Sequence, residues 1–248
     1  MFLNFKTVRN IRDLGGISLK EGEIKYKLLL RGGDLYSLSK EEFLILKNDF
    51  NLKTVIDFRS KNSFYIKKDQ IDSSITYYHY FTSDFLDQNL FTINIVGSFD
   101  EFFMKVYENL ATSENALRSY HQFIKNVIDA KEGAVYFHCT SGKDRTSIAA
   151  TILLLILGAS KEVIYQEHLL TNEYTKKELE EYLKKHPNIS KKEYDFMYAT
   201  YITKKEYLDC FFKNILDKFK TIDNYLINGL KLTKEDFKTL RTRYINYK

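Results

Sequence analysis

The sequence predicts an α/β fold with a short, largely parallel central sheet flanked by helices, followed by a helical C-terminal part. Before residue 158, short β-branched and aromatic runs alternate with stretches of helical period, which is typical of parallel strands joined by helices. From about residue 173 only helical patterns remain. We expect one domain over residues 1–248, with an α/β part over about 1–172 and a helical part over about 173–248.

Each expected element has a local signal. Residues 17–33 predict two strands about a turn at Glu21-Gly22, and Ser39 with Glu42 forms a capping box that begins a helix over 39–50. The remaining strands are expected at 53–58, 75–81 and 134–138, and the remaining helices at 99–110, 114–130, 145–157, 161–172, 173–185, about 190–200, 203–219 and 233–245.

Composition narrows the class of protein. Two cysteines in 248 residues do not make a disulfide framework, which suits a reducing compartment. The N-terminus has no apolar core of signal-peptide length, and the longest apolar run, of about 11 residues, is too short to cross a bilayer. We therefore expect a soluble, cytoplasmic protein, with export by a route without a signal peptide left open.

The stretch HCTSGKDRT, residues 138–146, has the pattern of a phosphate-binding loop. An apolar run that predicts a buried strand precedes it, and another that predicts a buried helix follows it. A strand, a tight loop and a helix N-terminus direct backbone N–H groups and the positive end of the helix dipole at one point. This arrangement is expected to bind an anion.

The residue types in the loop fit phosphoryl chemistry. A thiol with an ordinary pKa of about 8.5 ionises more readily at a helix N-terminus beside cations, so Cys139 is expected to be a nucleophilic thiolate. Arg145 offers a planar fork for two phosphate oxygens. Thr146 could stabilise the thiolate, and His138 could order the loop. The expected phosphate-binding residues are Thr140, Ser141, Gly142, Lys143, Arg145 and Thr146.

Two simpler interpretations compete with a phosphate site. Cys139 could be a buried structural cysteine beside a chance arginine, since free cysteine often acts as a small hydrophobe. A zinc site is disfavoured because the only other cysteine is Cys210 and no ligand spacing is present. We expect no metal or other cofactor and no nucleic-acid partner.

At these residues the chain resembles the atypical bacterial tyrosine phosphatases that also act on phosphoinositides. Their signature usually reads HCxxGKDRTG, and Ser147 stands where the family often has glycine. Gly32-Gly33 replaces a usual Ser-Gly. Four further stretches are similar to family motifs: VRNIRDLGG at 8–16, LLLRGGDL at 28–35, VIDFRS at 55–60 and HLLTN at 168–172.

The resemblance implies a cysteine-dependent phosphatase with a cysteinyl-phosphate intermediate, acting on phosphotyrosine in proteins and on phosphoinositides. One alternative is a catalytically inactive phosphate-binding module. A rhodanese-like sulfurtransferase, which also uses a loop cysteine, is disfavoured by the Lys-Asp-Arg-Thr run and the N-terminal matches. The resemblance also suggests that Arg31 shapes the domain, and we leave it outside the site.

The general acid remains open among four aspartates. Asp144 resembles the family's acid, although a helix N-cap is its simpler interpretation. Asp84 and Asp87 lie where ordinary tyrosine phosphatases carry their acid on a loop. Asp57, which we also consider a supporting residue, and Arg59 could either face the phosphate loop or form a structural ion pair.

The positive charge is concentrated near the C-terminus. Residues 201–248 hold 11 Lys or Arg and 6 Asp or Glu, a difference of +5 that equals the net charge of the whole chain. A solvated surface is the simpler interpretation. The alternative is peripheral contact with an anionic membrane, through Lys234, Lys238 and Arg241 on one helix face. Lys143 could reach a second phosphate of a phosphoinositide or only help to keep Cys139 ionised.

Overall fold

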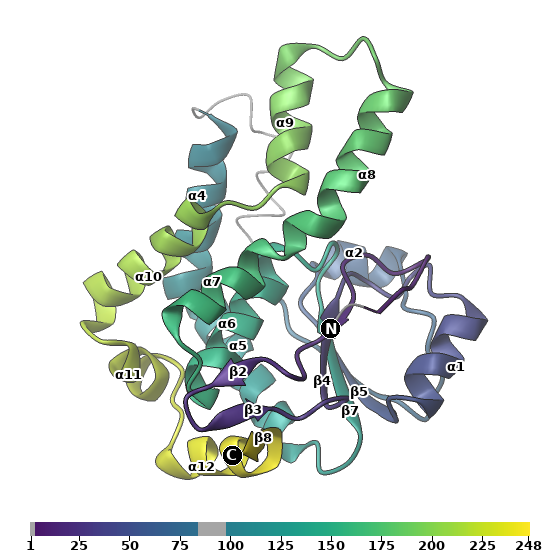
Figure 1. Cartoon of the computed structure of the whole chain (residues 1–248). Coiled ribbons are helices and arrows are strands. Elements are labelled where there is room, and N and C mark those ends of the chain that lie inside the picture. The colour runs from purple at the N-terminus through teal and green to yellow at the C-terminus, as the bar shows by residue number, and fades with distance from the viewer. Residues whose placement is uncertain (1–2, 84–97) are drawn as a thin grey trace.

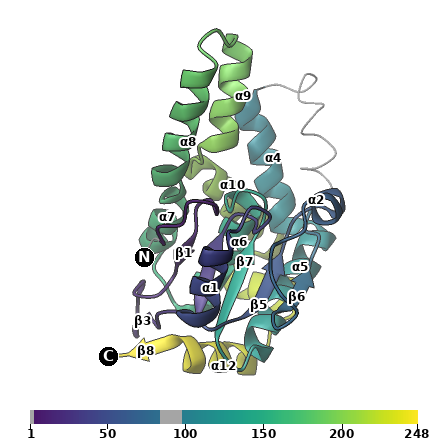
Figure 2. The same ribbon diagram turned by 90° about the vertical axis from the view of Figure 1, so that its right-hand side faces the viewer.

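A computed structural model describes residues 3–83 and 98–248, and its centre is a mainly parallel sheet (Figures 1 and 2). Across the described part, the strands lie in the order β1 (Arg12–Asp13), β4 (Leu29–Gly32), β7 (Ala134–His138), β5 (Leu52–Asp57) and β6 (Thr76–His79). Strand β1 is antiparallel to β4, and the other neighbours are parallel. The predicted α/β fold with a largely parallel sheet is confirmed.

The central strand β7 contributes side chains to both faces of the sheet because successive side chains alternate. Val135 and Phe137 enter the larger hydrophobic core, whereas Ala134 and Tyr136 enter the smaller one. Burial on both faces explains why this strand is a continuous apolar run. Cys139 continues the Val135–Phe137 register and lies on the side of the larger core.

Helices cover both faces of the sheet (Figure 2). Helix α1 (Lys40–Asn48) covers the smaller core, while α4 (Phe99–Thr112), α5 (Glu114–Asp129) and α6 (Asp144–Leu157) pack over the larger one. Every residue of α6 except Leu155 is buried. The short helix α2 (Lys61–Ile66), which had no sequence signal, follows β5.

The C-terminal part is mostly helical and packs on the α/β part. Helix α10 lies against α4, and α12 lies against α5 and α6. Figure 1 shows α8 and α9 as a hairpin that projects beyond the sheet. The elements are α7 (Lys161–Leu169), α8 (Thr171–Lys185), α9 (Lys191–Tyr201), α10 (Lys205–Phe219), α11 (Ile222–Asn224), the π-helical turn η1 (Tyr225–Gly229), α12 (Lys234–Tyr244) and β8 (Ile245–Tyr247).

Three expectations were wrong in detail. Residues 17–33 form three strands, β2 (Ser18–Leu19), β3 (Gly22–Ile24) and β4, because Lys27 adopts a φ of 62° and its amide donates to Asp13. The C-terminal part is not purely helical, since β8 pairs with β3. Helix 161–172 is two helices, because α7 ends at Leu169. Within the described residues, no helix is long and apolar enough to cross a membrane.

Candidate active site

The predicted loop lies between the end of β7 at His138 and the start of α6 at Asp144. This is the carboxyl edge of the parallel sheet, where ligands of open α/β folds bind. Lys143 occupies the N-cap of α6 and makes no side-chain cap. The first amides of α6 are therefore not capped by that side chain and are available to an anion.

Three successive carbonyls of the loop accept hydrogen bonds from residues of the N-terminal segment and β4 region. Because the peptides are trans, each N–H points away from its carbonyl. The amides of Ser141, Gly142 and Lys143 therefore face the side opposite these supports and form an anion cradle. The contacts are Asp34 N to Thr140 O at 3.1 Å, Asn10 Nδ2 to Ser141 O at 3.4 Å and to Gly142 O at 2.9 Å, and Arg31 Nη2 to Gly142 O at 2.6 Å.

Gly142 fits this loop because no side chain could. Its φ is +64°, and a Cβ built there would lie 2.4 Å from the carbonyl carbon of Gly32. The loop therefore packs directly on the end of β4, which is possible only with glycine at this position.

Arg31, which we had left outside the site, is part of the support. Glu167 Oε2 lies 2.7 Å from Arg31 Nη1, and Glu167 Oε1 lies 2.8 Å from Arg12 Nε. All three residues are buried. Burial and the nearby Arg12 lower the pKa of Arg31 to about 10, so Arg31 remains charged at neutral pH. One carboxylate thus orients the arginine that holds the loop.

We expect Glu167→Gln to lower the free energy of unfolding by about 3–5 kcal/mol, because two buried guanidinium groups lose their carboxylate. Thermal unfolding of the purified protein measures this loss. Glu173→Gln on the exposed side of α8 is the matched control. Equal melting temperatures for the two variants would show that the Glu167 pairs do not stabilise the fold.

Cys139 lies at the base of the loop and is 3% exposed. Burial by itself would raise the pKa of its thiol. The charge of Arg145 and the hydroxyl and amide of Thr146 lower the pKa by more than burial raises it, so the net shift is downward. This direction favours a thiolate, as expected from the sequence.

Arg145 is held in the loop by two hydrogen bonds, and one of its guanidinium donors is left without a partner among the described residues. Nη1 donates to Phe58 O at 3.1 Å, and Nη2 lies 3.4 Å from Thr140 Oγ1. Among the described residues, Nε has no hydrogen-bond partner although it is buried. Nε and Nη2 form the same edge of the planar group, and this edge matches two phosphate oxygens.

Asp144 is the first residue of α6 and not its N-cap, so the N-cap interpretation is wrong. Its Oδ1 accepts a hydrogen bond of 3.1 Å from the Tyr107 hydroxyl and lies 3.2 Å from Lys143 Nζ. Its side chain is 11% exposed, so most of it is buried.

Lys143 points away from solvent. Its Nζ donates to Ala199 O at 3.1 Å and lies 4.2 Å from the centre of the Phe103 ring. The side chain therefore links the loop to α9 and α4. In this arrangement it does not extend toward a second phosphate.

His138 lies in a buried cluster of charges under the loop. Its Nε2 is 3.0 Å from Asp69 Oδ2, and its Nδ1 is 3.8 Å from Asp57 Oδ1. Burial opposes the charge, but Asp69 and Asp57 raise the pKa of His138 to about 9, so it is protonated at neutral pH. Arg59 Nη2 lies 2.9 Å from Asp57 and 3.0 Å from Asp69. Of the two interpretations of Asp57 and Arg59, the structure therefore supports the ion pair.

Asp57, Asp69 and His138 could also be considered as metal ligands, since their donor atoms lie within 4.8 Å of one another. Arg59 already pairs with both carboxylates, and His138 carries a proton. Bringing a divalent cation into this cluster would place it beside two positive charges. The donor set therefore fits a structural charge cluster better than a metal site.

One residue next to the loop signature and one in the match at 168–172 have structural partners. Ser147, at the position where the family often has glycine, lies 2.7 Å from His168 Nδ1 through its hydroxyl. Asn172 exchanges hydrogen bonds with the backbone of Thr203. His168 is itself buried.

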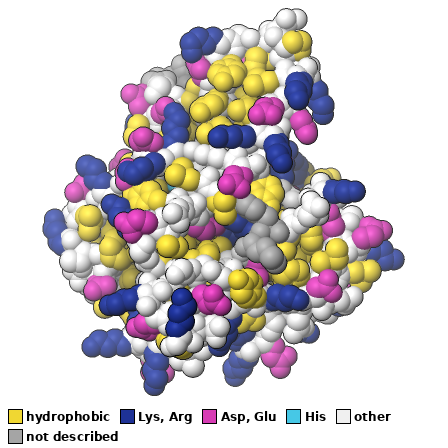
Figure 3. All heavy atoms as spheres, viewed as in Figure 1, with side chains coloured by type: hydrophobic (Ala, Val, Ile, Leu, Met, Phe, Trp, Pro, Cys, Tyr) yellow, Lys and Arg dark blue, Asp and Glu magenta, His cyan; other side chains and the backbone are white. Residues whose placement is uncertain are grey.

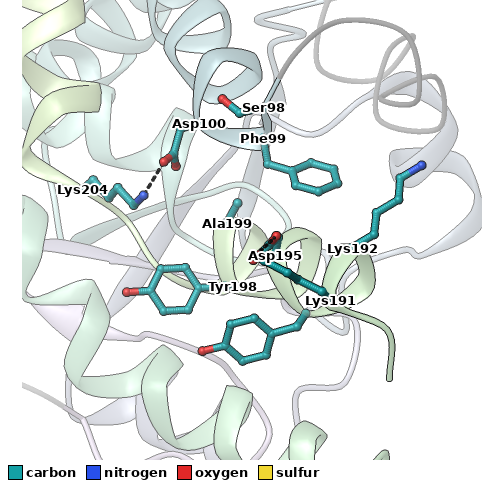
Figure 4. Close-up of a pocket in the computed structure, with 10 residues that line it drawn as sticks. Ser98, Phe99, Asp100, Lys191, Lys192, Asp195, Tyr198, Ala199 and Lys204 are labelled. Carbon is teal, nitrogen blue, oxygen red and sulfur yellow. Dashed lines mark hydrogen bonds and ion pairs between the residues drawn. The ribbon is translucent and has the colours of Figure 1, made fainter. Parts of the chain in front are cut away.

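A cavity of about 1000 Å³ lies between the start of α4 and α9 (Figure 4). Ala199, whose carbonyl accepts from Lys143, lines its wall, so the Lys143 side chain connects the loop to this wall. In Figure 3, hydrophobic side chains gather over α8 and α9 with charged ones around them. The other lining residues are Ser98, Phe99, Asp100, Lys191, Lys192, Tyr194, Asp195, Tyr198 and Lys204.

Sequence reasoning missed several supporting residues. Asn10 lies inside the matched stretch 8–16, and Glu167 immediately precedes the match at 168–172, so both had a local signal. Asp69 and Tyr107 lie outside any matched stretch. Asp84 and Asp87, the other candidate acids, lie outside the described residues.

The family model described as "Tyrosine phosphatase family" matches residues 3–246. The chain belongs to the tyrosine phosphatase family. It is therefore a phosphoric monoester hydrolase of the protein-tyrosine-phosphatase type, as the resemblance of residues 138–146 implied.

Two named proteins are similar in sequence to this tyrosine phosphatase. A protein of Cupriavidus necator, named as a tyrosine-protein phosphatase, is 25% identical over 98% of this chain and 88% of its own length. A tyrosine-protein phosphatase of Nostoc commune is 38% identical over 22% of this chain and 19% of its own.

Two solved structures show a more distant likeness. PTPMT1 in complex with PI(5)P has 13% identity and a TM-score of 0.35, over 77% of this chain and 92% of that one. TpbA of P. aeruginosa in complex with pTyr has 13% identity and a TM-score of 0.34, over 76% and 88%.

Proposed function

We propose that this tyrosine phosphatase hydrolyses phosphotyrosine in proteins, and phosphoinositides as a second substrate class, through a cysteinyl-phosphate intermediate. The observation that carries the proposal is the buried Nε of Arg145, which has no partner among the described residues, in the same loop as a thiol of lowered pKa. A bound phosphoryl group would satisfy this buried donor.

The proposed reaction has two steps. The Cys139 thiolate attacks phosphorus, the bond to the leaving oxygen breaks, and Asp144 in its protonated form gives that oxygen its proton. Water then attacks the cysteinyl phosphate and gives its proton to the Asp144 carboxylate, which releases phosphate and the thiolate. Arg145 and the loop amides would stabilise the equatorial oxygens in both steps, which we expect to be the largest catalytic contribution.

The phenyl or inositol ring that carries the phosphoryl group is proposed to lie in the cavity between α4 and α9. Phe99, Tyr194 and Tyr198 offer aromatic surface for a phenyl ring, and lysines on the same walls offer charge for further phosphates of an inositol ring. Lys143 is placed to hold the wall of this cavity at Ala199.

The proposal is tested by phosphate release from para-nitrophenyl phosphate, phosphotyrosine peptides and phosphoinositides in the presence of a chelator. Turnover of the first two would support the tyrosine phosphatase assignment, and turnover of the third would support the lipid class. Phosphate binding without turnover of any substrate would instead support the inactive phosphate-binding module.

We expect Asp144→Asn to lower kcat by roughly 10²–10³ for substrates with a poor leaving group and much less for nitrophenyl phosphate, whose leaving group hardly needs a proton. Steady-state kinetics on alkyl and nitrophenyl esters measure the contrast. Asp217→Asn on α10, an exposed aspartate far from the loop in sequence, is the matched control. An equal loss on both substrates would indicate damage to the loop and would leave Asp84 and Asp87 as candidate acids, since Asp57 is held in the ion pair with Arg59.

A further inference from the structure

Helix α2 exposes two large apolar side chains next to each other. Tyr65 is 68% exposed and Ile66 is 76% exposed, the highest values for large hydrophobic residues in the described part of the chain. Burial of such side chains is favourable, so two of them exposed on one helical turn indicate a surface that contacts another molecule or a membrane.

Lysines border this helical turn, and no acidic residue lies among them in the sequence. Lys61, Lys67 and Lys68 are exposed, and residues 58–68 contain no aspartate or glutamate. The next acid, Asp69, turns its carboxylate inward toward Arg59 and is 1% exposed. We call Lys61, Tyr65, Ile66, Lys67 and Lys68 the α2 face; it is apolar at its centre and positive at its border.

Internal contacts hold the α2 face outward. Phe64 stacks on His79 of β6 with ring centres 4.3 Å apart. Arg59 Nη1 donates to Lys67 O at 2.8 Å, and the Ser60 hydroxyl caps the start of the helix. These contacts use the inner side of α2, so Tyr65 and Ile66 have no place in the core.

The α2 face lies at the same edge of the sheet as the phosphate loop. Strand β5 ends at Asp57 just before α2, and the parallel neighbour β7 ends at His138 just before Cys139. Figures 1 and 2 show α2 at the end of the sheet from which α6 starts. A surface that contacted the α2 face would therefore lie on the side of the loop, next to the projecting α8–α9 hairpin.

The basic face of α12 is at the opposite end. Arg241 Nε donates to Ile156 O, near the end of α6, whereas the loop precedes the first residue of α6. A helix of this length spans about 20 Å. The membrane contact considered for Lys234, Lys238 and Arg241 would therefore turn the loop away from the bilayer.

We propose that the α2 face binds the surface of an anionic phospholipid bilayer and presents the phosphate loop to it. Aromatic and aliphatic side chains among lysines are the composition that inserts at the headgroup boundary. Two apolar side chains offer too small an area for a stable protein interface, whereas a bilayer needs no fixed shape complementarity. The benefit for lipid substrates depends on the proposed function, but the binding itself does not.

Co-sedimentation with vesicles tests the proposal on the full chain. We expect binding to phosphatidylcholine vesicles that contain phosphatidylserine, weaker binding to phosphatidylcholine alone, and loss of binding as salt rises. Lys61→Glu with Lys68→Glu should weaken binding roughly tenfold or more, and Ile66→Ser roughly fivefold.

The matched control is Lys234→Glu with Lys238→Glu, which makes the same change of charge on α12. It should change binding less than about twofold, because those lysines would face away from the bilayer. Turnover of para-nitrophenyl phosphate by both double variants, equal to that of the wild type, would show that the loop is intact.

The outcomes are distinct. The proposal would be overturned if the wild-type protein did not bind anionic vesicles, or if the α2 variants bound as well as the wild type. It would also be overturned if the α12 variant lost as much binding as the α2 variants. Vesicle binding by a wild type that releases no phosphate would overturn the proposed function and leave the α2 proposal standing.

Discussion

Cys139→Ser is expected to lower the rate of phosphate release roughly 10⁴-fold or more and to retain phosphate binding. The lowered pKa of the Cys139 thiol is the reason, because the arrangement that favours a thiolate cannot ionise an alcohol at neutral pH. The loop amides and Arg145 remain in place, so the anion site survives. Steady-state kinetics with chelator present and phosphate binding by calorimetry measure the two properties separately.

Cys210→Ser is the matched control. Cys210 is the other free cysteine, lies on α10, and has a pKa that burial raises, so it is not expected to act as a nucleophile. Continued turnover by Cys139→Ser in the presence of chelator would contradict the covalent mechanism.

Arg145→Lys is expected to lower kcat/KM by roughly 10³ and to weaken phosphate binding as well. Lysine keeps the charge but cannot donate to Phe58 O through one nitrogen while it offers two parallel donors to the phosphoryl group. The two effects together would distinguish Arg145 from Cys139, whose replacement should spare binding.

Arg118→Lys, which changes an exposed arginine on α5, controls for general effects of the substitution. Retained phosphate affinity in Arg145→Lys, with only kcat reduced, would show that the Nε–Nη2 edge of the guanidinium group does not hold the ground-state anion.

Local signals located the main elements of the site. Residues 134–138 predicted the strand and 145–157 the helix because both are apolar on all sides, and the structure has β7 and α6 there. The loop between them was therefore placed correctly at the edge of the sheet. Helix α2 was missed because its six residues bury no side chain, so no apolar period marks it.

The partners of individual charged residues could not be predicted from the sequence. Whether Asp57 and Arg59 pair with each other or face the loop depends on Asp69 and His138, which approach from other segments of the chain. The same holds for Lys143, whose partners on α9 and α4 are more than thirty residues away in sequence.

By itself the sequence predicted a phosphate-binding chemistry for the loop and determined its setting between a buried strand and a buried helix. These properties are local, since the spacing of Cys139 and Arg145 and the apolar runs beside them lie within a few turns of chain. Only the tertiary structure decided what orients the loop. Asn10 just before the antiparallel strand β1, Arg31 on β4 and Glu167 on α7 meet there because the fold packs these three segments beside the loop, and buried carbonyls and charges need partners among the groups next to them.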